Sequence, residues 1–334
     1  MPQAEPGKAP LWLVLFFLGL IIVIWGSTWL VIRIGNEYTD IFTGLALRFG
    51  IASTVLGALL LVFRIRVPLD KNAWLLYFLL WGCAFFLPYM LVYWAQRYIE
   101  SALTSLLFSV FPIFVIAFAH FIIPGDRMNW IKVIGALVSL CGLVLLFVGK
   151  VQADPDPEKW NPEKYTTGLG ALAMLAVIGS AFVQAFQTVI VKLRGKEIHP
   201  MALIFIPMLL AALTFAVITL FHEPEKKNVW VWQAWTCILI LAVLGSVVTF
   251  GIYFYLVQVV EVSKLSLNAF ITPLFSLFVG IVFGSEAISN LGWYGIPLAA
   301  GGVFLATRKW GVKKPEVPST AGMGDACAGS LEVP

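Results

Sequence analysis

One stretch of this chain places four polar side chains on a single face of an otherwise apolar segment. Ser180, Gln184, Gln187 and Thr188 recur at positions i, i+4, i+7 and i+8, which is the spacing of one face of an α-helix. Amides and hydroxyls that faced lipid would be costly, so we expect this face to point into the protein. It either holds neighbouring helices together by hydrogen bonds or contacts a polar ligand.

Aromatic side chains supply a second candidate surface. Trp25 and Trp29 lie one helical turn apart, as do Tyr89 and Tyr93, and Tyr253 belongs to a later apolar stretch. Rings with one polar atom stack on an amphiphilic solute and also offer it a hydrogen bond. In a chain with 14% aromatic residues, the same rings also serve core packing and the membrane interface.

Three serines complete the polar candidates for a binding cavity. Ser105 and Ser109 lie one turn apart, and Ser27 belongs to a Gly-Ser pair at 26–27 that recurs at 179–180. Such serines either bond back to their own helix and permit close packing, or they line a cavity.

Three ionisable side chains lie within or at the start of apolar stretches, where a charge is usually functional. Arg48 lies about seven residues into one stretch, and it either extends to the membrane interface or holds an anionic group in a cavity. Glu100 and Glu261 begin corresponding stretches, where a carboxylate meets the positive end of a helix dipole. Their role is either structural capping or proton coupling.

These candidates lie in a sequence that repeats itself. Residues 93–147 align with 254–307, which places Glu100 opposite Glu261 and Pro112 opposite Pro273, each pair 161 residues apart. A duplicated apolar unit of this kind is typical of secondary transporters whose binding site lies between the repeats. The two prolines interrupt helical hydrogen bonding at matching depths, and they act either as hinges or as static bends.

Composition places the chain in a membrane. Hydrophobic residues make up 60% of it and charged residues 12%, against about 25% in soluble domains, and the mean hydropathy is +0.92. Since about 20 apolar residues cross a bilayer as a helix, we expect ten transmembrane helices and no soluble catalytic domain. They are predicted at 12–33, 41–63, 73–95, 101–123, 131–149, 168–191, 200–221, 234–257, 265–284 and 290–308.

The distribution of Lys and Arg sets the expected orientation. With the N-terminus inside, the cytoplasmic positions hold 14 of these residues and the outer positions 6, so both termini should be cytoplasmic. The formal charge of +4 therefore reflects membrane topology and not affinity for nucleic acid. Because each unit has five spans, the second unit enters the membrane in the opposite direction, and the two form inverted repeats around a central cavity.

This organisation divides the chain into five parts. We expect a cytoplasmic N-terminal segment, a first five-helix repeat, an extracytoplasmic linker rich in Pro and charged residues, a second repeat and a disordered cytoplasmic tail. Their predicted bounds are 1–11, 12–149, 150–167, 168–308 and 309–334. The four cysteines and three histidines show no metal-ligand spacing, and we expect no metal or cofactor.

Several short motifs resemble those of the EamA family, which belongs to the drug/metabolite transporter superfamily. The resemblance covers roughly residues 12–308 and rests on WGSTWLVIRIG at 25–35, ALRF at 46–49, YIESALTSLLFSVFPIF at 98–114, PGDRM at 124–128 and FGSEAIS at 283–289. It implies an all-α integral membrane fold of ten helices in two inverted five-helix halves around a central cavity, working by alternating access. It also places the protein in the bacterial inner membrane, and it does not specify a substrate.

The predicted function is therefore secondary active or facilitative export of a small organic metabolite. Amino acids or related amphiphiles fit a cavity with few formal charges, and drugs or other toxic amphiphiles are the alternative substrates. The chain contains no GxxxxGK[ST] loop for ATP. A membrane-embedded enzyme is the alternative of a different class, and the absence of HExxH and GxSxG motifs argues against it. The expected partners are the substrate and the lipid bilayer, with proton coupling and oligomeric state left open.

Overall fold

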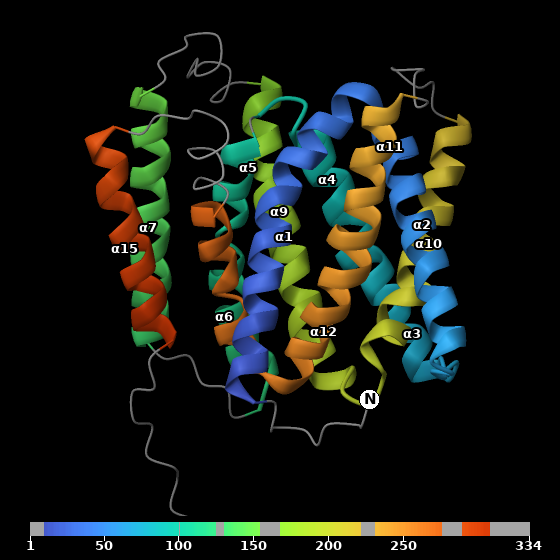
Figure 1. Ribbon diagram of the computed structural model, residues 1–334. Coiled ribbons are helices and arrows are strands. Elements are labelled where there is room, and N and C mark those ends of the chain that lie inside the picture. Colours follow the sequence, from blue (N-terminus) through green and yellow to red (C-terminus); the bar gives the residue numbers. More distant parts are fainter. Residues whose placement is uncertain are drawn as a thin grey trace, which may run out of the picture.

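A computed structural model describes residues 10–99, 101–124, 130–153, 168–221, 231–275 and 289–307. Within these ranges every regular element is a helix (Figure 1). Eight helices or runs of consecutive helices there are long and apolar enough to cross a membrane, and they correspond to the first eight predicted spans. The ninth predicted span lies partly outside the described residues, as do the predicted tail and most of the linker.

The first half begins with two long helices and continues with two interrupted ones. In chain order its elements are α1 (Leu11–Tyr38), α2 (Ile41–Val62), α3 (Lys71–Leu80), the π-helix η1 (Trp81–Phe86), α4 (Leu87–Ala95), α5 (Ser101–Phe108), α6 (Phe111–Ile122) and α7 (Trp130–Ala153). Since α7 runs to Ala153, the first residues of the predicted linker are helical.

The second half follows the same order. Its elements are α9 (Gly168–Arg194), α10 (Pro200–Phe221), α11 (Trp232–Leu239), the π-helix η2 (Ile240–Val248), α12 (Thr249–Val259), α13 (Val262–Leu265) and α15 (Asn290–Thr307).

Two aspartates begin helices of the first half. The Asp40 carboxylate accepts hydrogen bonds from the backbone N–H groups of Phe42 and Thr43 at 3.0 and 3.3 Å, and Asp70 does the same for α3. A side-chain acceptor at this position satisfies backbone donors that have no partner within the helix.

The two π-helices occupy matching places in the repeats. Adding the repeat separation of 161 to the bounds of η1 gives 242–247, which lies within η2. Each therefore interrupts the third helix of its repeat at the same depth. A π segment leaves backbone carbonyls available to other partners and is common at functional sites.

The outermost helix pair gives direct evidence of the inverted symmetry. Gly135 of α7 corresponds to Gly295 of α15, and Gly142 corresponds to Gly302. A Cβ atom on Gly135 would lie 2.7 Å from the Gly302 carbonyl oxygen, and one on Gly142 would lie 2.8 Å from that of Gly295. Each glycine thus meets the counterpart of the other, as expected for antiparallel helices related by a twofold axis.

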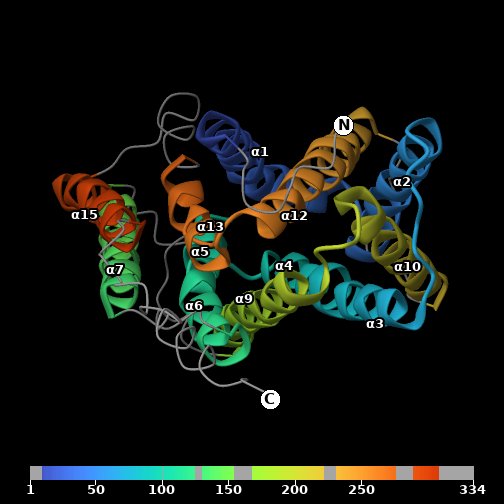
Figure 2. The same ribbon diagram turned by 90° about the horizontal axis from the view of Figure 1, so that it is seen from below.

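The remaining helices form the body of the bundle. In both views α7 and α15 lie together at one edge, and α2, α3 and α10 lie at the opposite edge (Figures 1 and 2). Between these edges, α1 and α12 face α4 and α9 when the bundle is seen from below (Figure 2). The largest buried cluster is apolar and aromatic, and includes Phe49, Phe85, Phe215 and Phe254.

Candidate functional site

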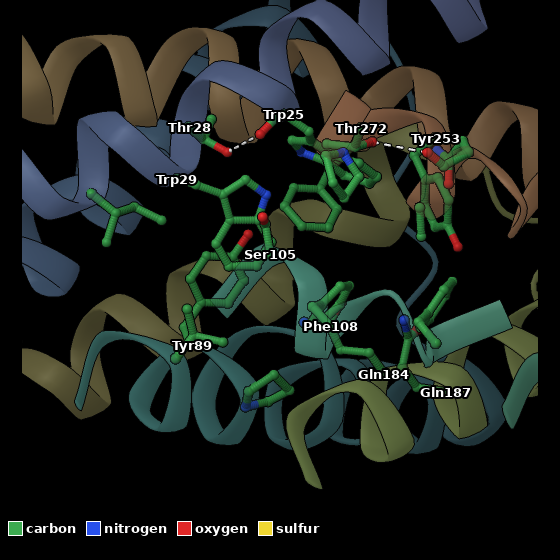
Figure 3. Close-up of a pocket in the computed structure, with 18 of the residues that line it drawn as sticks. Trp25, Thr28, Trp29, Tyr89, Ser105, Phe108, Gln184, Gln187, Tyr253 and Thr272 are labelled. Atoms are coloured by element: carbon green, nitrogen blue, oxygen red, sulfur yellow. Dashed lines mark hydrogen bonds between the residues drawn. The ribbon is translucent and has the colours of Figure 1, made fainter. Parts of the chain in front are cut away.

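A cavity lies among helices of both repeats. Its empty space amounts to about 900 Å³, counted together with the solvent at its open side. Its lining comes from α1, α2, α4, α5, α6, α9 and α12, and from the helical segment 268–275. Gln184 and Gln187 approach it from one side, while Trp25, Thr28 and Thr272 lie opposite them (Figure 3).

Aromatic rings form much of the cavity wall. Trp25 packs with ring-centroid distances of 5.4 Å to Phe250, edge to face, and 5.2 Å to Tyr253, tilted, so ring contacts join α1 to α12. The ring centroids of Trp29 and Phe108 of α5 lie 5.6 Å apart in a tilted arrangement. Of the predicted aromatic surface, Trp25, Trp29, Tyr89 and Tyr253 line the cavity, and their rings suit a solute with an apolar body.

A hydrogen-bonded group joins α9 to α12 at one end of the cavity. Gln187 donates from Nε2 to the Thr188 hydroxyl at 2.9 Å, and the Thr188 and Tyr253 hydroxyls lie 3.3 Å apart. Gln184 lines the cavity one turn earlier in α9. The polar face predicted for the sixth span thus points inward and both holds helices together and reaches the cavity.

Two amide groups of this cavity are incompletely paired. The Gln187 Oε1 and the Asn268 Nδ2 are buried and have no hydrogen-bond partner among the described residues. Both residues line the cavity, Gln187 from α9 and Asn268 from the helical segment 268–275, so it offers one acceptor and one donor. A buried polar atom without a partner costs about 1–3 kcal/mol, which a bound polar group would recover.

Among the described residues, Arg48 is the one charged residue in the cavity lining, and its exposed fraction is 2%. Its Nε donates to the Ser246 hydroxyl at 3.0 Å and its Nη1 to the Tyr93 hydroxyl at 3.0 Å. Its Nη2 donates to the Gly245 carbonyl at 3.3 Å and the Tyr89 hydroxyl at 3.5 Å. Of the two alternatives open for Arg48, the structure places the guanidinium in the cavity and not at the interface.

The π-helix explains part of this arrangement. Gly245 and Ser246 both belong to η2, where the wider turn frees backbone carbonyl groups. Because a guanidinium has five N–H donors in a fixed plane, it can satisfy these acceptors and the tyrosines of α4 together.

Some predicted cavity residues lie outside the lining. The Ser27 hydroxyl donates back to the Val23 carbonyl at 2.8 Å, and this residue does not reach the cavity. Tyr93 reaches it only through Arg48, while Ser105 lines it directly. Ser109 lies at the break between α5 and α6, where its hydroxyl is placed 2.9 Å from the Ser105 carbonyl and 3.2 Å from that of Ala269.

The two prolines also differ in position. Pro112 stands in the first turn of α6, directly after the break at 109–110, so the fourth span is two helices. Pro273 lies in the helical segment 268–275 and lines the cavity. Whether either proline is a hinge stays a prediction.

One turn beyond the cavity, the ends of α9 and α12 are tied together. Lys192 donates from Nζ to the carbonyls of Val257, Gln258 and Val260 at 2.7, 3.2 and 2.6 Å. Gln258 returns two bonds, to the carbonyls of Gly195 and Ile198 at 2.9 and 2.8 Å. We call Lys192, Gln258 and these five carbonyls the α9–α12 latch. A lysine on the last carbonyls of a helix satisfies acceptors and complements the helix dipole.

Glu261 lies away from the cavity, between α12 and α13. Its side chain does not cap α13 and instead forms ion pairs with Lys132 of α7 and Lys264. Partial burial raises the pKa of this carboxyl group, but hydrogen bonds and charge from the two lysines outweigh burial and hold the pKa below its usual value. Glu100 lies outside the described residues.

Sequence patterns did not single out several lining residues. Thr28, Thr272 and Asn268 line the cavity, as do the apolar residues Ile32, Pro88, Val92, Phe108, Phe111, Phe250 and Ala269. Sequence patterns also did not single out Ser246, one of the hydrogen-bond partners of Arg48. Asn268 carried a usable signal, because an amide in a predicted membrane span is costly unless it faces the protein interior.

Comparisons with known proteins agree with this architecture. The family model of the EamA-like transporter family matches residues 11–148 and 171–308, one match for each repeat. The chain is 26% identical over 296 residues to the Bacillus subtilis protein named uncharacterized transporter YoaV, covering 87% of this chain and 96% of that protein. It is 25% identical over 293 residues to the Escherichia coli protein named uncharacterized inner membrane transporter YedA, covering 85% and 87% respectively.

A solved crystal structure shares the fold. Its TM-score is 0.72 at 19% identity, and the match covers 88% of this chain and 96% of the other. Together with the duplicated helices and the cavity between the repeats, the two family-model matches show that this chain belongs to the EamA-like transporter family, and that it is a multi-pass membrane transporter.

Proposed function

We propose that this transporter exports small organic metabolites, best represented by amino acids or related amphiphiles, by alternating access at the cavity between its repeats. The observation that carries the proposal is the pair of unpaired amide atoms, Gln187 Oε1 and Asn268 Nδ2, within an aromatic cavity. A substrate with polar groups and an apolar body would satisfy both. No metal or cofactor takes part in this proposal.

The chemistry of the cavity supports a substrate with little net charge. Among the residues that the structure describes, the lining carries one formal charge. A strongly charged solute would need several opposite charges to replace its hydration. A zwitterion or weakly charged amphiphile needs few, and rings such as Trp25 and Phe250 would contact its apolar part.

The orientation in this proposal follows the positively charged residues. The latch end of the bundle carries Lys192, Arg194 and Lys196 and would face the cytoplasm, together with both termini. The latch then closes the cavity on the cytoplasmic side in this conformation. Transport requires it to open, because export must admit substrate from that side.

The interrupted helices support a rocking motion. Breaks at 109–110 and the matching π-helices η1 and η2 leave backbone bonds that can exchange partners without unfolding a helix. We propose that the break at 109–110 and the two π-helices bend during the conformational change, while the tightly packed α7 and α15 move little.

The proposal does not assign proton coupling to Glu261. Its ion pairs keep the pKa below the usual value, so it stays ionised near neutral pH. A facilitative or otherwise coupled cycle fits the described residues equally well.

Counterflow in proteoliposomes tests the proposal. Purified protein would be reconstituted in liposomes preloaded with one unlabelled amino acid, and uptake of the labelled form would be measured across a panel that includes the aromatic amino acids. We expect saturable, protein-dependent counterflow for at least one of them. If none is taken up while a cationic drug or dye is exchanged, the amino acid assignment is wrong and the drug alternative stands.

A further inference from the structure

We propose that Arg48 binds the carboxylate of the substrate, so that the transported class is an aromatic or similarly apolar solute bearing one carboxylate. This inference rests on the proposed function and specifies its substrate. It begins from the burial of Arg48, whose guanidinium lines the cavity at 2% exposure within a membrane span.

The charge of Arg48 is solvated but not neutralised. Every acceptor that it contacts is neutral, namely two tyrosine hydroxyls, one serine hydroxyl and one carbonyl. In the described parts of the chain no Asp or Glu forms an ion pair with it. A buried charge is usually paired, because its burial costs several kcal/mol in a low dielectric. An anionic ligand would supply the missing partner.

The surroundings of Arg48 are suited to receive such an anion. In the described parts of the chain four acceptors serve its five N–H donors, which leaves one N–H for a ligand. Tyr89, which lines the cavity, accepts from Arg48 and keeps its own hydroxyl proton, which can be donated to the same anion. The guanidinium carbon also lies 4.7 Å from the centre of the Tyr89 ring, which fixes its plane.

The charge count defines the class of anion. Of the lining residues that the structure describes, Arg48 alone is charged, so a single negative charge neutralises it in the occupied site. A carboxylate has that charge, whereas a phosphate monoester would leave excess negative charge in the membrane. The adjoining wall of Trp25, Phe108 and Phe250 then contacts the apolar part of the solute.

Three ligands that differ only in charged groups test this assignment. Binding of 3-phenylpropionate, phenylalanine and phenethylamine to purified protein in nanodiscs would be measured by isothermal titration calorimetry. We expect wild-type protein to bind the two carboxylates at least about tenfold more tightly than the amine, since an ion pair of moderate strength contributes that much. This comparison needs no variant and does not depend on whether a substituted Arg48 folds.

Two variants then locate the effect. Arg48→Gln should bring the ratio of carboxylate to amine affinity to about one, and Arg48→Lys should restore part of it. Arg33→Gln, on an exposed part of α1, should keep the wild-type ratio. The proposal is overturned if wild-type protein binds the amine as tightly as the carboxylates, or if Arg48→Gln weakens all three ligands equally.

The counterflow measurement distinguishes a failure of the carboxylate assignment to Arg48 from a failure of the proposed transport function. Counterflow of an amino acid without any preference for carboxylates refutes the role of Arg48 and leaves the transporter of amphiphiles intact. Absence of binding by all three ligands, together with absence of amino acid counterflow, refutes both.

Discussion

Replacing Lys192 by Met should open the bundle at the end where the latch lies. Met keeps an apolar stem of similar length but removes the three N–H donors that reach the carbonyls of Val257, Gln258 and Val260. These carbonyls end α12, so no later helical N–H group replaces the lysine.

The three hydrogen bonds of Lys192 set the expected size of the effect of Lys192→Met. Side-chain hydrogen bonds in membrane proteins contribute about 0.6 kcal/mol on average and about 1.7 at most, so three contribute about 2–5 kcal/mol. If they exist only while the latch is closed, even 2 kcal/mol changes the ratio of closed to open states about 30-fold.

Thiol labelling from the latch side measures this ratio. Ala269, which lines the cavity, would be replaced by Cys in a protein whose native cysteines have been removed. In inside-out vesicles a membrane-impermeant thiol reagent should label Ala269→Cys at least about tenfold faster with Lys192→Met than without it. Lys196→Met provides the matched control, because Lys196 is an exposed lysine two residues beyond the end of α9 and its replacement should leave the rate unchanged.

An unchanged labelling rate with Lys192→Met would refute this reasoning, provided that the cysteine reacts fully in denatured protein. The latch bonds would then exist in both states or be replaced by water, and another contact would limit opening.

Two further predictions concern stability. Gly142→Ala should lower the thermal unfolding midpoint by several degrees, because its Cβ would lie 2.8 Å from the Gly295 carbonyl oxygen and such overpacking costs about 1–3 kcal/mol. The control is Gly179→Ala, which should not lower the midpoint because no atom lies within 4 Å of the added Cβ. Glu261→Gln should lower the midpoint at neutral pH, and the difference from wild type should disappear in acid, once the carboxylate of the folded protein is protonated. The folded-state pKa is depressed, so the stabilisation is present above the unfolded pKa and is lost as the pH falls through the folded pKa. A difference that persists in acid, measured by differential scanning fluorimetry, would contradict the ion-pair explanation.

The sequence specified the architecture because membrane spans and internal repeats leave strong patterns. Helical spacing also identified the face containing Gln184 and Gln187, since a polar stripe in an apolar helix has few alternatives to facing inward. The same reasoning was less useful for Ser27, because a hydroxyl can satisfy itself on its own helix and need not face a cavity.

Contacts between distant helices were beyond sequence reasoning. The partners of Arg48 come from α4 and η2, nearly 200 residues away along the chain in the case of Ser246, and depend on a π-helix that no pattern predicted. The latch was missed for a similar reason, because Lys192 resembles an ordinary lysine at a membrane interface until the end of α12 is placed beside it. Apolar lining such as Ile32 and Val92 could not be separated from core packing.

Counterflow by matched glutamine variants tests most directly whether this cavity carries the substrate. Gln187 and Gln96 both have a buried amide atom without a partner among the described residues, but Gln187 lines the cavity and Gln96 does not. With the amino acid that gives the strongest counterflow, Gln187→Leu should raise the half-saturating concentration about 5- to 160-fold, for the loss of a 1–3 kcal/mol hydrogen bond. Gln96→Leu should leave it unchanged. Equal effects of the two substitutions, or normal counterflow by Gln187→Leu, would contradict the account.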